Sequence, residues 1–173
     1  EKRPVETILE VADREGMATG LVTTTRITHA TPACFVAKVE HRSQEKDIAA
    51  QLTVAATQKG FPQVMIGGGS RYFTAEQMAA FSTADYQTPK TMEELAASKG
   101  PRVAGFLASS HLPFAIDEGT VLPKITAKAV SLLRGQGEGF FLMVEGGRID
   151  HACHQHDAAA CLHDQLDFDA AVG

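Results

Sequence analysis

The sequence lacks three features: an excess of basic residues, an apolar run of membrane-spanning length, and an even number of cysteines. It carries 16 Lys and Arg against 21 Asp and Glu, and the net charge of -5 argues against a nucleic-acid-binding groove. No apolar run approaches the ~20 residues that a membrane-spanning helix needs. What is present, 173 residues of which 44% are hydrophobic, is enough for one globular core.

The amino terminus also lacks an initiating Met and a visible signal peptide, so we expect a processed or truncated start. Three cysteines, Cys34, Cys153 and Cys161, cannot all pair within one chain. We expect Cys153 and Cys161 on one continuous helix, where their spacing gives a rise of about 12 Å, too far for a disulfide. All three are interpreted as small buried residues on helix faces.

Predicted strands and helices alternate along the whole chain. Short apolar or β-branched runs predict strands, and segments with apolar residues on one face predict helices. The expected strands are 20–25, 62–66, 103–107 and 140–144. The expected helices are 4–15, 31–42, 45–59, 75–81, 92–98, 125–134 and 150–165, with another beginning at 168 and mostly loop from 109 to 124. This order predicts an α/β fold with a largely parallel sheet and no internal domain boundary.

The segment from Phe140 to His154 carries the strongest chemical signal. Five apolar residues predict a strand buried on both faces, and Glu145 follows at its end. Two glycines then allow a sharp turn before a helix that we expect to begin at Asp150. His154 lies four residues after Asp150, so both side chains should share one face of the first helical turn.

These residues together predict a metal site at the end of the strand. A carboxylate and an imidazole one turn apart can share a metal ion, and oxygen and nitrogen ligands suit zinc. Glu145 should face the crevice in which open α/β sheets bind ligands. Simpler interpretations exist for each residue alone: Asp150 as an N-cap, His154 as a surface histidine, and Glu145 as a solvent-facing strand end. Their grouping around the double glycine favours the metal site.

Two motifs resemble the alkaline phosphatases. One is Val-Glu-Gly-Gly-Arg-Ile-Asp-His at 144–151, followed by His154; the other is Val-Thr-Thr-Thr-Arg-Ile-Thr-His-Ala-Thr-Pro-Ala at 22–33. The resemblance runs through the whole chain. It implies that residues 1–173 form a single partial domain of that family's three-layer α/β/α sandwich, and that the parent protein hydrolyses phosphate monoesters.

The resemblance also implies roles for individual residues. Thr31 and Glu145 match residues that bind magnesium, an ion that oxygen ligands suit. Asp150 and His154 match two ligands of one zinc ion. Arg42, which we expect at the end of the helix that Thr31 caps, matches the arginine whose planar guanidinium clamps the substrate phosphate. Taken alone, Thr31 could be only a cap, and Arg42 only a cation favoured by the helix dipole.

Histidines add supporting positions. His29 matches a residue near the magnesium ion, and His151 one near the phosphate, both through water, so both are expected to assist substrate binding. A polar group follows on the last expected helix and could supply further metal ligands, although a solvated polar face is the preferred interpretation. It comprises His156, Asp157, His163 and Asp164.

The resemblance implies that the remaining catalytic groups lie outside this chain. In the family a serine held between two zinc ions is transiently phosphorylated. That serine, and an aspartate that bridges zinc and magnesium, would precede the first residue. The Asp-His pair of the second zinc and the last histidine of the first would follow Gly173. We therefore expect an internal fragment that is inactive alone and holds zinc weakly, since two protein ligands are few. The family further implies a homodimer exported to the periplasm or the cell exterior.

Two alternatives stay open. One is another metallo-hydrolase of the same superfamily, such as a phosphodiesterase, a sulfatase or a phosphoglycerate mutase, against which the full motif at 145–151 argues. The other is a non-catalytic α/β module that binds metal or partners through the histidine-rich helix.

Overall fold

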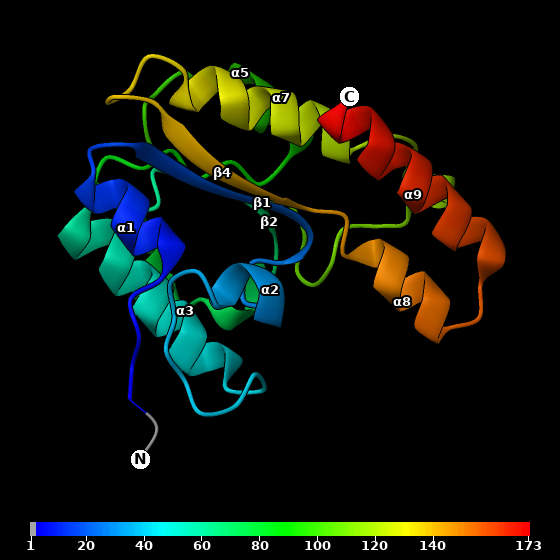
Figure 1. The fold of residues 1–173 in the computed structure, drawn as a ribbon, viewed down its shortest axis with the longest axis horizontal. Coiled ribbons are helices and arrows are strands. Elements are labelled where there is room, and N and C mark those ends of the chain that lie inside the picture. The colour runs from blue at the N-terminus through cyan, green and yellow to red at the C-terminus, as the bar shows by residue number, and fades with distance from the viewer. Residues whose placement is uncertain (1–2) are drawn as a thin grey trace.

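A computed structural model describes residues 3–173 and contains one four-stranded sheet in the order β3-β2-β1-β4 (Figure 1). The strands are β1 (Ala18–Arg26), β2 (Val64–Gly68), β3 (Val103–Phe106) and β4 (Phe140–Glu145). All three pairings are parallel. The expected α/β fold with a parallel sheet is therefore confirmed.

Helices connect the strands and cover both faces of the sheet. Figure 1 shows α1 and α3 on one side and α5, α7 and α9 on the other. The helical elements are α1 (Ile8–Arg14), α2 (Ala30–Ala33), α3 (Glu45–Val54), the π-helix η1 (Ala55–Lys59), the 3-10 helix η2 (Ser70–Tyr72), α4 (Ala75–Thr83), α5 (Met92–Ala97), α6 (Ala115–Glu118), α7 (Leu122–Leu133), α8 (Arg148–His154) and α9 (Ala158–Val172). No helix within residues 3–173 is long and apolar enough to cross a membrane.

Side-chain alternation along the strands separates two cores. Leu21 of β1 and Met65 of β2 belong to the cluster beneath α1, α3 and α4. Their neighbours Val22 and Ile66 point the other way and pack with α5 and α7. Because successive residues of a strand face opposite sides of the sheet, both faces are buried and the architecture has three layers.

Strand β4 is less buried than its apolar run predicts. Met143 is buried, but Phe140 is 37% exposed and Leu142 and Val144 are only partly buried. Within the described residues β4 pairs with β1 alone, so one of its edges lacks a neighbouring strand. The prediction of a strand buried on both faces is therefore wrong here.

The prediction of a helix from Thr31 to Arg42 is also wrong. Helix α2 ends at Ala33, its N-cap is His29, and Thr31 lies inside it. Irregular chain follows, in which the Lys38 amide donates to the Gln51 side chain at 2.8 Å and not to a helix carbonyl. This tertiary contact overrides the local helical pattern. Arg42 consequently sits in the irregular segment before α3.

The single helix expected from Asp150 to Gln165 is two helices with a tight reversal between them. His156 adopts a positive φ of 56°, and Asp157 then caps α9 by accepting the Ala160 amide at 3.0 Å. The segment from Phe168 continues α9. The reversal brings the sulfurs of Cys153 and Cys161 to 3.2 Å, so their predicted separation was wrong. Cys34 and Cys153 are exposed, against expectation.

Two aspartates of α9 order the segment before α7. Asp164 accepts the Ala115 amide at 3.2 Å, and Asp167 accepts the Leu122 amide at 2.9 Å. Both carboxylates are buried, and burial raises the pKa of Asp164. The interpretation of Asp164 as part of a solvated face is therefore wrong, and the 109–124 segment is more helical than expected.

Candidate functional site

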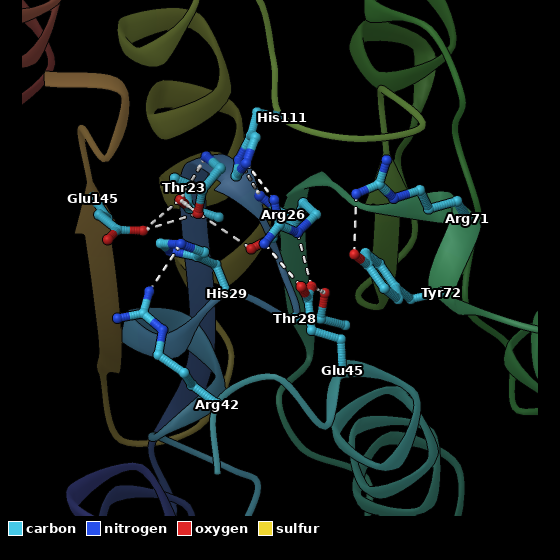
Figure 2. Close-up of polar contacts among 11 residues, drawn as sticks. Thr23, Arg26, Thr28, His29, Arg42, Glu45, Arg71, Tyr72, His111 and Glu145 are labelled. Atoms are coloured by element: carbon cyan, nitrogen blue, oxygen red, sulfur yellow. Dashed lines mark hydrogen bonds and ion pairs between the residues drawn. The ribbon is translucent and has the colours of Figure 1, made fainter. Parts of the chain in front are cut away.

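Polar side chains gather where the parallel strands end, at the carboxyl edge of the sheet. Glu145 ends β4, Thr23 and Thr25 lie near the end of β1, and His29 and His111 follow β1 and β3 (Figure 2). The ends of parallel strands lie at one edge, which is where α/β proteins usually bind ligands. Polar residues that are far apart in the sequence thus lie together at the carboxyl edge of the sheet.

Glu145 is fixed by two buried hydroxyls of the neighbouring strand. Its Oε2 atom accepts from Thr23 Oγ1 at 2.6 Å and from Thr25 Oγ1 at 3.2 Å. The chain then turns tightly against β1 at Gly147, where a Cβ would lie 2.4 Å from Thr25 Cγ2. The glycine is needed for this close approach. Both hydrogen bonds use Oε2, so Oε1 is left for another partner.

Arg42 reaches the site although it lies outside a helix. Its Nη2 donates to Nε2 of His29 at 3.0 Å, as Figure 2 shows. A guanidinium is only a donor, so neutral His29 carries its proton on Nδ1. That Nδ1 is buried and has no hydrogen-bond partner within residues 3–173. Burial and the nearby Arg26 and Arg42 lower the pKa of His29, which favours the neutral ring.

Three imidazoles form a cluster beside Glu145. The ring centroids of His29 and His151 are 5.4 Å apart, and those of His111 and His151 are 4.3 Å apart. Burial and the neighbouring cations lower the pKa of His151, and lower that of His111 to about 3. The imidazoles of the cluster are therefore neutral near pH 7. The guanidinium groups of Arg26 and Arg148 lie beside them.

His111 and Arg26 are site residues that sequence reasoning missed. Arg26 contacts His111 through its guanidinium and pairs with Glu45 at 2.7 and 2.8 Å. Thr28 donates to the same carboxylate at 2.6 Å. Burial alone would raise the pKa of Glu45, but these donors outweigh it and lower the pKa. A signal for His111 existed, since it follows the end of a predicted strand.

Arg148 was also overlooked, although it lies inside the first motif. Its Nη1 donates to Nδ1 of His151 at 2.9 Å, and its guanidinium stacks 3.6 Å from the Phe114 ring centroid. Burial lowers the pKa of Arg148. The contact orients His151 so that its Nε2 is the protonated nitrogen.

Asp150 and His154 share one face of α8, as predicted. Asp150 Oδ1 and His154 Nε2 lie 3.5 Å apart, and both side chains are exposed. His154 also lines an open hollow of about 270 Å³ together with His111, Arg148, His151 and Gln155. The hollow connects the predicted zinc ligand to the imidazole cluster.

Thr31 is the least engaged of the predicted residues. It is exposed on α2, and its backbone carbonyl accepts a hydrogen bond from the Cys34 thiol. Helix α2 packs against β1 and β4, which places Thr31 on an element beside Glu145. Within residues 3–173 no three His, Cys, Asp or Glu side chains converge to form a metal-binding group.

Comparisons with known proteins agree with the motifs. The family model described as alkaline phosphatase matches residues 1–173. Alkaline phosphatase 4 of Bacillus subtilis (strain 168) is 34% identical over 98% of this chain and 38% of its own length. Streptomycin-6-phosphate phosphatase of Streptomyces griseus is 32% identical over 98% of this chain and 50% of its own length. The chain thus spans half or less of these relatives.

Solved structures give the same result. The cold-active alkaline phosphatase of a psychrophilic Shewanella species superposes with a TM-score of 0.92 at 35% identity, over 98% of this chain and 42% of that one. The Thermus thermophilus alkaline phosphatase gives 0.89 at 37% identity, over 98% and 37%. A mutant of the TAB5 alkaline phosphatase with bound Mg gives 0.82 at 28% identity, over 96% and 49%. Fold, motifs and family model coincide, and the chain belongs to the alkaline phosphatase family.

Proposed function

We propose that this chain is a partial alkaline phosphatase domain which supplies the phosphate-binding arginine and part of a zinc and magnesium site. The reaction is hydrolysis of phosphate monoesters through a phosphoserine intermediate in the parent protein. The observation that carries the proposal is the contact of Arg42 with His29 beside the Glu145 carboxylate (Figure 2). His29 belongs to the motif at 22–33 and Glu145 to the motif at 144–151, so the two motifs meet at this contact.

Arg42 and two histidines form the phosphate-binding side. Arg42 is exposed, so its remaining N–H groups can pair with two phosphate oxygens at once. The buried Nδ1–H of His29 lacks a partner within residues 3–173, which favours a water or an anion beside it. His151, with Nε2 protonated, supplies a further donor.

The donor set of α8 fits zinc. Two ligands of a tetrahedral zinc ion lie about 3.3 Å apart when each bond is about 2.05 Å. The 3.5 Å between Asp150 Oδ1 and His154 Nε2 is close to this separation. Both side chains are exposed and can take up an ion without rearranging a core. Zinc at this position would supply a Lewis acid that stabilises charge on a phosphoryl oxygen.

Glu145 and Thr31 are the proposed magnesium ligands. Thr23 and Thr25 hold the carboxylate of Glu145 through Oε2, so Oε1 keeps a fixed position for a cation. Oxygen ligands alone suit magnesium. The homodimer and the export to the periplasm or cell exterior that the family implies belong to the same proposal.

The test uses the complete phosphatase that contains this chain, with p-nitrophenyl phosphate as substrate. Asp150→Ala and His154→Ala should each lower zinc content and reduce kcat at least a hundredfold, since each removes a metal ligand. The matched control is His163→Ala, an exposed histidine of the next helix. Unchanged zinc content and rate in both ligand variants would contradict the metal assignment.

The isolated 173-residue chain gives a second test. With only two protein ligands for zinc, it should bind the ion weakly in a calorimetric titration and should not turn over p-nitrophenyl phosphate. Turnover by the purified chain would show that the proposed division of the catalytic groups is wrong.

A further inference from the structure

The reversal between α8 and α9 places two thiols against each other. We propose that Cys153 and Cys161 form a reversible intramolecular disulfide that closes this reversal. The inference does not depend on the proposed function, because it concerns the two sulfurs and the chain between them. It assigns a redox modification site to a pair of residues outside the phosphate-binding cluster.

The local backbone holds the two sulfurs in place. Cys153 Sγ and Cys161 Sγ lie 3.2 Å apart, close enough for a bond to form after small side-chain rotations. The Asp157 amide donates to Ala152 O and the Cys161 amide to Asp157 O, each at 3.0 Å. These bonds fix the end of α8 and the start of α9, so the approach of the thiols does not depend on a mobile loop.

The pair is accessible, whereas the third cysteine is engaged elsewhere. Cys153 is exposed and Cys161 is partly exposed, so a small oxidant can reach either sulfur. The Cys34 thiol donates to Thr31 O on α2, at the other motif. Selective pairing of Cys153 with Cys161 is therefore expected among the three cysteines.

The chemistry requires a disulfide oxidant, for which oxidised glutathione is a suitable example. The thiolate of one cysteine attacks a glutathione sulfur, forms a mixed disulfide and displaces one glutathione thiolate. The second cysteine attacks the mixed disulfide and displaces the other. The two protein thiols are oxidised, the glutathione disulfide is reduced to two thiols, and the two protons pass to the leaving thiolates.

The bond would restrain the last turn of α8. Asp150 and His154 both lie on this seven-residue helix, and His154 directly follows Cys153. Closing the loop removes conformations in which α8 frays away from α9. The oxidised and reduced forms should therefore differ in the local stability of the segment that presents His154.

The experiment uses the purified, reduced chain with oxidised glutathione, followed by alkylation of remaining thiols and mass spectrometry. Both cysteines lie in one tryptic peptide that begins at Ile149, since no Lys or Arg follows Arg148. We expect this peptide to lose two hydrogens and to gain no alkyl group. Cleavage before Asp157 should leave its two parts joined. Cys34 should be alkylated.

A second measurement tests whether the disulfide stabilises the end of α8 in the folded chain. Amide hydrogen exchange of the peptide covering 155–157 should slow on oxidation and recover after reduction. Cys34→Ser should behave as the parent sequence, whereas Cys153→Ser should show no oxidant-dependent change. Full alkylation of Cys153 and Cys161 after treatment, a lasting mixed disulfide, or pairing with Cys34 would each overturn the proposal.

Discussion

Nη2 of Arg42 lies 3.0 Å from Nε2 of His29, which joins an irregular segment to the N-cap of α2 thirteen residues earlier. The contact holds an exposed guanidinium over the imidazole cluster beside Glu145. It replaces the helix end that was expected to position Arg42. The orientation of the Arg42 guanidinium therefore depends on His29. The effect of the planar guanidinium on phosphate binding can be tested separately from the effect of its positive charge.

Arg42→Lys should weaken inhibition by inorganic phosphate about tenfold in the complete phosphatase. The lysine keeps the positive charge but loses the planar pair of donors, and a charge-assisted hydrogen bond contributes about 1.5–3 kcal/mol. The inhibition constant for phosphate measures the effect. Arg71→Lys is the matched control, because Arg71 is exposed and its guanidinium lies against the neighbouring Tyr72, to whose hydroxyl it donates (Figure 2). An unchanged constant for Arg42→Lys would remove the arginine from the phosphate site.

Gly147→Ala should destabilise the chain by about 1–3 kcal/mol, the usual cost of overpacking. The added Cβ would lie 2.4 Å from Thr25 Cγ2 and 3.0 Å from Glu145 Cδ, so strand β1 or the carboxylate must move. Urea unfolding gives the free energy. For comparison, the Cβ of Gly100→Ala would meet the flexible Gln87 side chain at 3.3 Å and should cost less. Equal stability of both variants would contradict the close approach at Gly147.

Two ion pairs allow a comparison of buried and exposed charge. Glu45→Gln should lower the free energy of unfolding by about 2–3 kcal/mol, because it leaves Arg26 largely buried without its carboxylate. Side-chain exposures in this pair are 14% and 11%. Glu6→Gln, whose partner Arg14 is 56% exposed, should cost less than about 1 kcal/mol. Urea unfolding measures both, and similar losses would show that the Arg26 pair is no stronger than a surface pair.

Most of the fold was accessible from the sequence because the strands are short apolar runs that alternate with amphipathic helices. Local capping chemistry also agrees with the structure, since Thr74 and Thr91 precede α4 and α5 and each accepts the backbone amide three residues ahead. Errors occurred where a side-chain contact or the conformation of a single residue overrides the local pattern. The Lys38 amide donates to the Gln51 side chain and not to a helix carbonyl. His156, with its positive φ, lies between two helices where a single helix was predicted.

The candidate site was predicted through its motif residues and not through the residues that support them. Asp150 and His154 could be paired because helical spacing fixes their relation. His111 could not be paired with Arg26 in this way, because the two residues are 85 positions apart and only the sheet brings them together. Contact between the sulfurs of Cys153 and Cys161 was likewise not predictable, since it depends on one reversal of the chain.

The pH dependence of stability should reveal the neutral imidazole cluster. The pKa of His111 lies near 3 in the folded chain, below its ordinary value of 6.5, because of burial and the facing groups Arg26, His151, Arg148 and His29. A lowered pKa means that the unfolded chain takes up the proton more readily. The stabilising contribution is therefore complete above pH 6.5 and is lost as the pH falls toward 3.

His111→Gln should accordingly flatten the decline in unfolding free energy between about pH 7.5 and about pH 5, where an ordinary histidine titrates. Part of the decline should remain, since burial also lowers the pKa of His29 and His151. His163→Gln, at an exposed position of α9, should leave the profile unchanged. Urea unfolding at several pH values provides the profile, and NMR should show that the His111 ring stays neutral down to about pH 5. A normal titration of that ring would mean that the cluster is open to solvent and cannot hold neutral donors around an anion.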